Sequence, residues 1–249
     1  MSLRQRSLPL LALTLFAMLA QVAHAQDEQV VRMRTALAAP ERSAENKARD
    51  AARKPIETVQ FLGIKTGDTV VDMIATGGWF TEVLSAAVGR RGKVYMQNPA
   101  FLVQKDEPVL LKRLGNVEPV HTSLAQGGVT GKADAAITAL NLHDVYNGYA
   151  DQPAGEPAAV TFLQGVYAAL KPGGVLGVID HVGIEGQDNA KLHRMLPQQA
   201  RDALTKAGFT IEAESTILEN PADDHTKGVI DPSLGRHTDQ FLLRARKPR

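Results

Sequence analysis

The sequence predicts an α/β fold: a seven-stranded, mostly parallel sheet with an antiparallel terminal strand and helices on both faces. The first observation is that five short apolar runs, rich in β-branched residues, alternate with helical patterns. Such alternation is typical of a parallel sheet that helices cover on both sides. The second observation is that the last two strand patterns, 210–218 and 238–247, have only a loop between them. A hairpin of this kind adds an antiparallel strand to a parallel sheet.

The chain begins with the pattern of a secretory signal peptide, residues 1–25. Arg4 and Arg6 form a basic start, an apolar run follows at 8–20, and residues 23–25 read "AHA", a small-x-small cleavage site. The apolar run is short for a membrane span, which favours cleavage over anchoring. We therefore expect no stable membrane insertion after cleavage and a periplasmic or secreted localisation.

Composition narrows the classes of partner. The chain has 249 residues, no cysteine and a formal charge of +1, which becomes −1 once Arg4 and Arg6 are removed. A near-neutral chain lacks the electrostatic footprint of a nucleic-acid-binding protein, so we expect no nucleic-acid partner. The absence of cysteine excludes disulfides and thiol catalysis. Composition leaves the oligomeric state undetermined.

Two segments precede the predicted sheet. Residues 26–44 are polar and alanine-rich, and we expect them to form a loosely attached arm, followed by a folded domain over 45–249. The charged stretch 45–54 has only a weak alanine stripe, which indicates a helix with a solvated face. Pro55 can open a further helix, and Gly63 suits its end.

Hydrophobic period and turn residues place the remaining elements. Helical patterns repeat apolar residues at three and four positions, as in 80–88, whereas strand patterns are short and continuously apolar. Strands are expected at 68–73, 92–98, 117–123, 133–144, 175–181, 210–218 and 238–247. Helices are expected at 55–62, 80–88, 109–115, 158–170 and 197–209. The polar stretch 220–237 is rich in turn formers and predicts a mobile loop.

The turn between the first strand and the following helix reads "DMIATGGW". Asp72 ends the strand, and Gly77 and Gly78 stand where the helix begins. Backbone N–H groups at such a turn, together with the helix start, favour a polar ligand. Trp79 is the chain's single tryptophan, and we interpret it either as a wall for that ligand or as a core anchor.

These residues carry a family resemblance. The stretch "KPIETVQFLGIKTGDTVVDMIATGGWFTEVLSAAVGRRGKVYMQN" resembles the front half of class I S-adenosylmethionine-dependent methyltransferases, and "YAALKPGGVLGVIDH" resembles a later strand of that family. The chain looks most like an exported bacterial group known as predicted methyltransferases. The resemblance covers most of residues 55–246 and implies a Rossmann-like, methyltransferase-like domain over 45–249. It also implies S-adenosylmethionine as the cofactor and methyl transfer to an unidentified small-molecule or protein acceptor.

The family's first motif, D-x-G-x-G-x-G, is only partly present. Asp72 and Gly78 match it, whereas Ile74 and Thr76 replace two glycines. A residue with a side chain disfavours positive φ by about 1–2 kcal/mol, so we expect φ < 0 at Ile74. The Thr76 side chain limits close backbone approach, which predicts weaker cofactor binding, with its hydroxyl as a substitute donor.

The family usually has an acid at the end of the second strand, where it holds the ribose hydroxyls. The equivalent residues here, Gln97 and Asn98, are neutral. Their amides could still bond a diol, but without charge assistance. The cofactor-binding residues that the resemblance implies are Asp72, Ala75, Thr76, Gly77, Gly78, Gln97, Asn98 and Asn141.

Polar side chains also stand at the ends of the fourth and fifth predicted strands. His143 and Asp144 end the fourth, and Asp180 and His181 end the fifth. Ligands of open α/β sheets bind beyond the carboxyl ends of the strands, so His143, Asp144 and His181 are candidate catalytic residues. His143 could act as a general base that Asp144 orients. Alternatively, Asp144 caps a helix and His143 lies on the surface.

The same four side chains could form a metal site. Their spacing matches no recognised metal signature, so we expect no metal. His193 follows on a segment that could cover the site, and we interpret it as a solvated or packing residue. Five further residues are interpreted as part of a polar surface: Asp223, Asp224, His225, His237 and Asp239.

Three functions therefore remain to be compared. The first is methyl transfer from S-adenosylmethionine, which needs orientation and one base rather than a covalent nucleophile. The second is a non-catalytic binding module of the same fold for another small ligand in the periplasm. A dinucleotide-dependent dehydrogenase fits less well, because its fingerprint needs G-x-G-x-x-G and an acid after the second strand.

Overall fold

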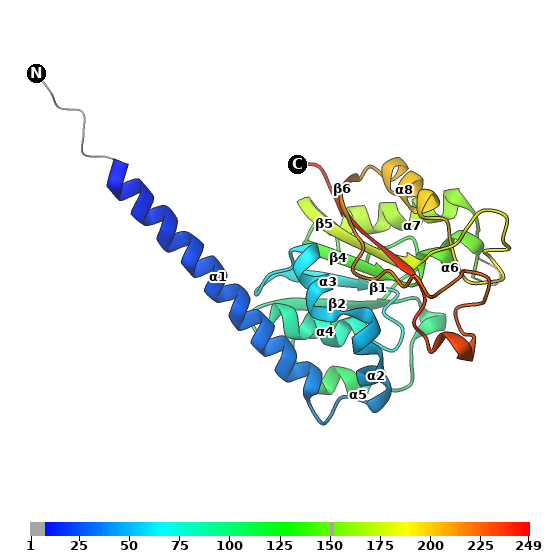
Figure 1. Cartoon of the computed structure of the whole chain (residues 1–249), viewed down its shortest axis with the longest axis horizontal. Coiled ribbons are helices and arrows are strands. Elements are labelled where there is room, and N and C mark those ends of the chain that lie inside the picture. The colour runs from blue at the N-terminus through cyan, green and yellow to red at the C-terminus, as the bar shows by residue number, and fades with distance from the viewer. Residues whose placement is uncertain (1–7, 150–151) are drawn as a thin grey trace, which may run out of the picture.

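The computed structural model describes residues 8–149 and 152–249, which form one sheet with helices on both faces (Figure 1). The seven strands of this described part lie in the order β3-β2-β1-β4-β5-β7-β6. Strand β7 runs antiparallel to its neighbours β5 and β6, and the other pairs are parallel. The predicted fold class is confirmed. The strands are β1 Thr69–Met73, β2 Lys93–Asn98, β3 Val117–His121, β4 Ala133–Ala139, β5 Leu170–His181, β6 Thr210–Ser215 and β7 Gln240–Arg246.

Helices bury an apolar face against each side of the sheet. The end of α1, α3 and α4 pack on one side, and α6, α7 and α8 pack on the other. Every residue of α4 is buried, which makes it the central helix of its layer. The helices are α1 Leu8–Ala38, α2 Ala44–Arg53, α3 Pro55–Leu62, α4 Trp79–Val88, α5 Glu107–Arg113, α6 Leu142–Asn147, α7 Glu156–Ala169 and α8 Pro197–Lys206.

Helix α1 joins the predicted signal peptide and the predicted arm without a break, and its first part projects away from the sheet (Figure 1). Its end is firmly packed. Met33 is 1% exposed, and the Gln29 amide donates to the carbonyls of Ile64 at 3.0 Å and Ala87 at 2.9 Å. The expectation of a loosely attached arm is therefore wrong for this helical part. Within the described part of the chain, no helix combines the length and hydropathy that a membrane crossing needs.

The fourth strand is shorter than the sequence predicts. It ends at Ala139, because Leu140 adopts a positive φ of 60° and Asn141 then caps α6. His143 and Asp144 therefore lie in the first turn of α6 rather than at the end of a strand. Asn141, not Asp144, occupies the N-cap position of this helix, but its side chain makes no capping hydrogen bond, and the Asp180 carboxylate accepts from the backbone N–H of His143 instead.

The sheet places a crevice between β1 and β4. The chain passes from β1 to β2 and β3 on one side, and then returns to lay β4 on the other side of β1. In open α/β sheets, ligands bind at the point where the strand order reverses, beyond the carboxyl ends of the strands. The structure therefore directs attention to the turns that follow β1 and β4.

Candidate functional site

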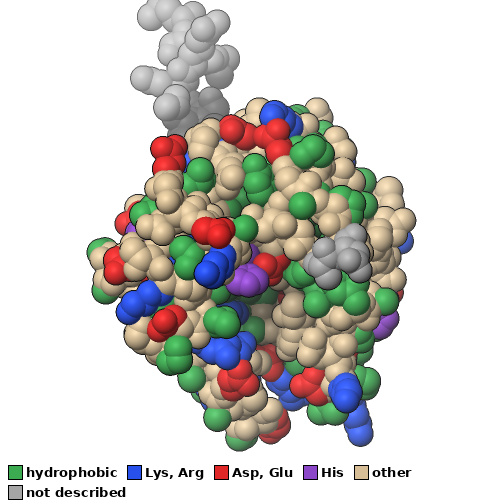
Figure 2. Space-filling view, turned by 90° about the vertical axis from the view of Figure 1, so that its right-hand side faces the viewer, with side chains coloured by type: hydrophobic (Ala, Val, Ile, Leu, Met, Phe, Trp, Pro, Cys, Tyr) green, Lys and Arg blue, Asp and Glu red, His purple; other side chains and the backbone are tan. Residues whose placement is uncertain are grey.

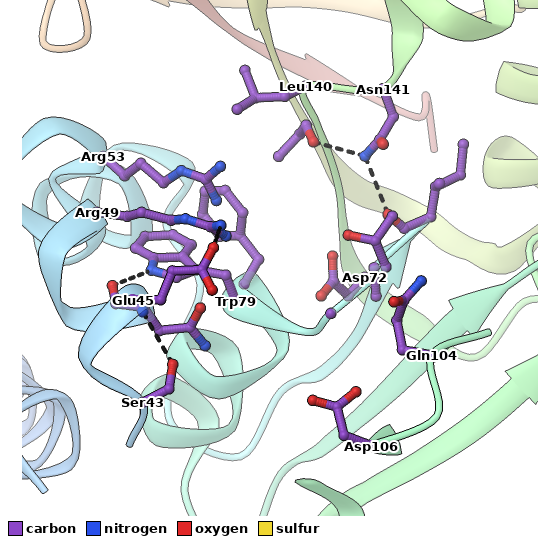
Figure 3. Close-up of a pocket in the computed structure, with 17 residues that line it drawn as sticks. Ser43, Glu45, Arg49, Arg53, Asp72, Trp79, Gln104, Asp106, Leu140 and Asn141 are labelled. Carbon is purple, nitrogen blue, oxygen red and sulfur yellow. Dashed lines mark hydrogen bonds and ion pairs between the residues drawn. The ribbon is translucent and has the colours of Figure 1, made fainter. Parts of the chain in front are cut away.

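A cavity of about 520 Å³ lies at the carboxyl ends of β1 and β4. Figure 3 shows Arg49 and Arg53 of α2 on one side of it and Gln104 and Asp106 on the other, with Asp72 between them. Five of the predicted cofactor residues line this cavity: Asp72, Ala75, Thr76, Gly77 and Asn141. The remaining three, Gly78, Gln97 and Asn98, lie outside its lining.

The turn after β1 has the backbone of a glycine loop although it lacks two of the glycines. Ile74 and Thr76 adopt φ values of 53° and 48°. The expectation of φ < 0 at Ile74 is therefore wrong. Each left-handed residue costs about 1–2 kcal/mol, so the surroundings must hold the turn in this shape.

Gln97 and Asn98 supply that support. The Gln97 side-chain oxygen accepts from Ile74 N at 3.0 Å, and the Asn98 side-chain oxygen accepts from Thr76 N at 2.7 Å. Both side chains are completely buried. The prediction that these two side chains contact the ribose hydroxyls is therefore wrong. Instead they hold the turn, because a neutral amide oxygen is a sufficient acceptor for each of the two backbone N–H groups.

The two glycines of the turn have different roles. A Cβ on Gly77 would meet nothing within 4 Å, so this residue leaves the cavity open. A Cβ on Gly78 would lie 2.3 Å from Leu110 Cδ2, and Gly78 has a φ of 75°. Gly78 is therefore needed for close packing against α5 and for the left-handed N-cap of α4, rather than for contact with a ligand.

Asp72 is a buried acid that still lines the cavity. Burial raises the pKa of its carboxyl to about 7, although a hydrogen bond from the Thr81 hydroxyl at 2.6 Å and the charge of Arg53 oppose that rise. The carboxyl therefore changes charge near neutral pH. A cation bound in the cavity would favour its ionised form.

The raised pKa makes a prediction for stability. Folded Asp72 keeps its proton up to about pH 7, whereas an unfolded aspartate releases it near 3.8, so this group lowers stability as the pH rises between those values. Asp72→Asn should match the parent near pH 4 and be more stable at pH 8, by up to about 1.4 kcal/mol for each pH unit in between. Urea unfolding at several pH values measures this.

Asp202→Asn serves as the control, because Asp202 is exposed on α8 and accepts only a hydrogen bond from Gln198. Its stability curve should run parallel to that of the parent. A parallel curve for Asp72→Asn as well would show that the Asp72 carboxyl has an ordinary pKa.

Helix α2 forms a wall of the cavity, which corrects its interpretation as a solvated helix. Its residues Glu45, Asn46, Arg49 and Arg53 line the cavity, whereas Lys54 does not. The Nε atom of Arg49 is buried and has no hydrogen-bond partner among the described residues. An unpaired buried donor of this kind is costly unless a ligand supplies the acceptor.

Trp79 has both of the roles considered for it. It is 4% exposed, and its indole N–H donates to the Asn46 carbonyl at 3.0 Å and to Asp50 at 3.1 Å. It thus anchors α2 to α4 while one side of the ring lines the cavity. Arg53 lies over the ring at 4.8 Å from its centroid, which is a cation–π distance.

Asp106 and Gln104 are site residues that the sequence interpretation missed. Both are exposed, lie on the segment between β2 and α5, and line the cavity. The family pattern predicts an acid directly after the second strand, whereas Asp106 comes eight residues after Asn98 and returns to the cavity only in the fold. The acidic run "KDE" before Pro108 is the one local signal for it.

A second cavity of about 440 Å³ adjoins the first, and both are lined by Glu45, Arg49, Arg53 and Leu140. It is also lined by His181 and by residues of the segment 220–237, among them Arg236. Burial, with the charges of Arg49 and Arg236, lowers the pKa of Arg53 to about 10. This clustering of guanidinium groups indicates that the joined cavities suit an anionic group.

The segment 220–237, predicted as a mobile loop, contributes to the lining of the second cavity and is anchored at Asp223 and His225. Asp223 is 2% exposed and forms a two-pronged ion pair with the fully buried Arg194, at 2.9 and 3.0 Å. His225 also pairs with Asp239 at 2.9 Å. The interpretation of Asp223 as part of a polar surface is therefore wrong, because its carboxylate is needed to neutralise Arg194.

The predicted catalytic residues lie together near the second cavity. His143 Nδ1 lies 2.6 Å from Asp180, and the ring centroids of His143 and His181 are 5.4 Å apart. His193 joins them, with its Nδ1 at 2.9 Å from Asp144. Figure 2 shows a histidine side chain in the hollow at the centre of this face, surrounded by acidic and basic side chains.

Their charges differ from the sequence expectation. Burial lowers the pKa of His143, but the carboxylates of Asp180 and Asp144 outweigh it and raise that pKa to about 10. Protonated His143 cannot accept a proton, so its interpretation as the general base is corrected. Burial lowers the pKa of His181 to about 3, which leaves the ring neutral but makes it a weak base unless a bound anion raises that pKa.

Comparison with known proteins identifies solved structures with a similar fold. No family model matches the chain, and no curated protein matches it. A SAM-dependent methyltransferase of Aquifex aeolicus is 20% identical with a TM-score of 0.58, over 80% of this chain and 93% of its own. The Burkholderia thailandensis 1,6-didemethyltoxoflavin-N1-methyltransferase, solved with S-adenosylhomocysteine, is 16% identical with a TM-score of 0.56, over 100% and 94%.

A further structure of the same fold is the cyclase SpnF, at 18% identity and a TM-score of 0.58, over 80% of this chain and 81% of its own. At these identities the comparisons show the fold. The resemblance to class I methyltransferases is therefore confirmed as a likeness of fold. Because a cyclase has the same fold as these methyltransferases, the fold alone does not identify the reaction, which must be inferred from the site.

Proposed function

We propose that this protein binds S-adenosylmethionine in the first cavity and transfers its methyl group to a small-molecule acceptor in the second. The observation that carries the proposal is the polar cavity at the β1/β4 crevice, which combines guanidinium groups on one wall with carboxyl groups on the other. The fold relatives named as methyltransferases support the same assignment.

The donors and acceptors in the cavity fit this cofactor. Arg49, with its unpaired Nε, and Arg53 would hold the carboxylate of the amino-acid part. Asp72 would face the ammonium group, and Asp106 would accept from the ribose hydroxyls. A volume of about 520 Å³ lies in the range of small-molecule sites, roughly 300–1,000 Å³.

When bound, the cofactor supplies an electrophilic methyl group on a sulfonium centre. The protein's task is then to position an acceptor for in-line approach and to remove its proton. His181 is placed for the second task, because its Nδ1 is hydrogen-bonded to the Thr238 hydroxyl at 2.6 Å and its ring lines the second cavity. A negatively charged acceptor beside the ring would raise the low pKa of His181 and so strengthen it as a base. Arg53 and Arg236 favour an acceptor that carries negative charge.

Calorimetric titration of the purified protein with S-adenosylhomocysteine tests the cofactor assignment. We expect one binding site, and we expect Asp106→Asn to weaken binding by about tenfold, because a charge-assisted hydrogen bond exceeds a neutral one by roughly 1 kcal/mol. Asp202→Asn, on the exposed face of α8, should bind as the parent does. Absence of any heat from the parent at millimolar ligand would reject the proposal.

One observation supports the second function, a non-catalytic binding module of the same fold. Ile74 N, Ala75 N and Thr76 N all donate within the protein, to the Gln97 side chain, the Gln97 carbonyl and Asn98 respectively. These N–H groups are therefore not available to a cofactor. This arrangement is compatible with a non-catalytic binding module for another small ligand. A folded protein that does not bind S-adenosylhomocysteine would favour this alternative.

We also propose that the chain is exported to the periplasm or secreted and cleaved after Ala25. Residues 24–28 are exposed in α1, and the contacts that Gln29 makes with the Ile64 and Ala87 carbonyls lie beyond the cleavage point, so cleavage leaves these contacts intact. N-terminal sequencing of the protein from the producing cell should give Gln26 as the first residue. An uncleaved chain in the cytosol would contradict export.

A further inference from the structure

We propose that His143, Asp144 and His193 form a binding site for a divalent first-row transition-metal ion beside the second cavity. This site is independent of the proposed cofactor chemistry, since none of its ligands lines the first cavity. This site is difficult to predict from the sequence, because His193 is separated from the other two ligands by about fifty residues. The fold brings one ligand atom of each residue within 4.8 Å of the others.

The distances between the ligand atoms fit a shared ion. Asp144 Oδ1 lies 3.2 Å from His143 Nε2 and 2.9 Å from His193 Nδ1. Metal–ligand bonds of about 2.1 Å at right angles place neighbouring ligand atoms about 3.0 Å apart, and tetrahedral angles place them about 3.4 Å apart. Small side-chain adjustments would therefore admit an ion on the open side of the three atoms.

Asp180 orients the first ligand. Its carboxylate is completely buried, and it accepts from the backbone N–H of His143 at 2.8 Å and lies 2.6 Å from Nδ1 of the same residue. This contact holds one ring proton on Nδ1, so a metal ion would take the place of the proton on Nε2, which faces Asp144 at 3.2 Å. Metal-binding histidines commonly have such a carboxylate behind them, because it fixes both tautomer and ring direction.

The third ligand is held in a strained position. His193 has a φ of 54°, which costs a residue with a side chain about 1–2 kcal/mol. The adjacent Arg194 is fully buried and paired with Asp223, so the segment cannot easily relax. Strain that the surroundings maintain is typical of functional positions.

The ligand set indicates the class of ion. Two imidazoles and one carboxylate suit Zn²⁺, Fe²⁺, Co²⁺ or Mn²⁺, whereas Mg²⁺ and Ca²⁺ prefer oxygen ligands alone. Access is available, because the side chains of His193 and Asp144 are 54% and 26% exposed. The ring of His181, which lines the second cavity, lies 5.4 Å from that of His143, so the ion would sit next to the proposed acceptor.

Cobalt binding tests the proposal directly. The purified protein, treated with EDTA and dialysed, is titrated with Co²⁺ by calorimetry and by visible absorption. We expect one equivalent to bind, with an absorption band from nitrogen and oxygen ligands, and no competition from Mg²⁺. His193→Ala and Asp144→Asn should each weaken binding by at least tenfold, and Asp180→Asn by about 10–100-fold.

His121→Ala is the matched control, because His121 also pairs with a carboxylate, Glu107 at 2.8 Å, but belongs to no three-ligand cluster among the described residues. Its binding should equal that of the parent. Thermal unfolding verifies that each variant is folded. If Asp144→Asn does not fold, His193→Ala still tests the proposal, because the side chain of His193 is exposed.

Two results would overturn the metal site. One is the lack of stoichiometric binding of Co²⁺, Zn²⁺ and Mn²⁺ by the parent, and the other is equal binding by the parent and His193→Ala. Either would show that the cluster is a hydrogen-bond network only. S-adenosylhomocysteine affinity of the EDTA-treated protein is measured separately, so failure of the metal site and failure of the proposed function are distinguished.

Discussion

Glu82→Ala should destabilise the protein by roughly 3–5 kcal/mol, the cost of removing one member of a buried ion pair. Glu82 is 5% exposed and accepts from Arg42 Nε at 2.7 Å, and it also pairs with Arg113. The Arg42 side chain is 1% exposed and would lose one of its two carboxylate partners, the other being Asp50. Urea unfolding monitored by circular dichroism measures the change.

The effect should extend to the cavity. Arg42 joins Glu82 of α4 to Asp50 of α2, and Asn46 of α2 donates to Glu82 at 3.1 Å. These contacts hold the helix that carries Arg49 and Arg53, so Glu82→Ala should also weaken S-adenosylhomocysteine binding. Glu82→Gln, which keeps an acceptor, should lie between the parent and Glu82→Ala in both measurements.

Glu214→Ala is the matched control, because Glu214 forms an equally direct pair with Arg201, at 2.6 and 2.7 Å, but on the surface. Exposed pairs contribute about 0–1 kcal/mol, so this variant should remain close to the parent. If Glu82→Ala also changes stability by less than about 1 kcal/mol, the buried network does not anchor α2.

The fold was predictable because its determinants are local. Short runs rich in β-branched apolar residues, such as residues 69–73, favour strands covered on both faces. Pro55 and Gly63 stand at the two ends of the same helix in sequence and structure. Gly63 has a φ of 71°, the left-handed conformation that a helix end favours. The alternation of strands and helices predicted the parallel part of the sheet, and the final hairpin predicted its antiparallel strand, whereas the order of the strands was not predicted.

The details of the site depended on contacts between distant residues. Positive φ at Ile74 is unfavourable by local energy, and hydrogen bonds with the distant side chains of Gln97 and Asn141 stabilise it. In the same way, α2 was interpreted as solvated because its apolar stripe is weak, whereas polar contacts from Arg42 and Trp79 hold it against α4. A periodicity analysis detects apolar packing and not polar anchoring.

The histidine cluster illustrates the same limit. Sequence order placed His143 and Asp144 beyond the fourth strand, and the structure confirms that they lie near Asp180 and His181. The order of residues in the sequence could not assign the charges of the histidines, because the pKa of each histidine depends on which carboxylates surround it. Asp180 and Asp144 flank His143, whereas His181 has the Thr238 hydroxyl as its ring partner.

His181→Asn should reduce methyl transfer by about 10²–10⁴-fold, the usual contribution of a general base. The reason is geometric: Nδ1 is hydrogen-bonded to Thr238, and Nε2 has no hydrogen-bond partner among the described residues, in a ring that lines the second cavity. The rate of S-adenosylhomocysteine release is measured with the small-molecule extract of the producing cell as the source of acceptor. His121→Ala, outside both cavities, should retain the parent rate.

The affinity for S-adenosylhomocysteine separates a role in proton transfer from a role in binding. His181 does not line the first cavity, so His181→Asn should leave this affinity within about twofold of the parent. Thr238→Val, which removes the partner of Nδ1 but keeps the imidazole, should cause a smaller loss of rate than His181→Asn. Equal losses of rate and of affinity in His181→Asn would instead assign His181 to the structure of the cavity, and the base would have to come from the acceptor itself.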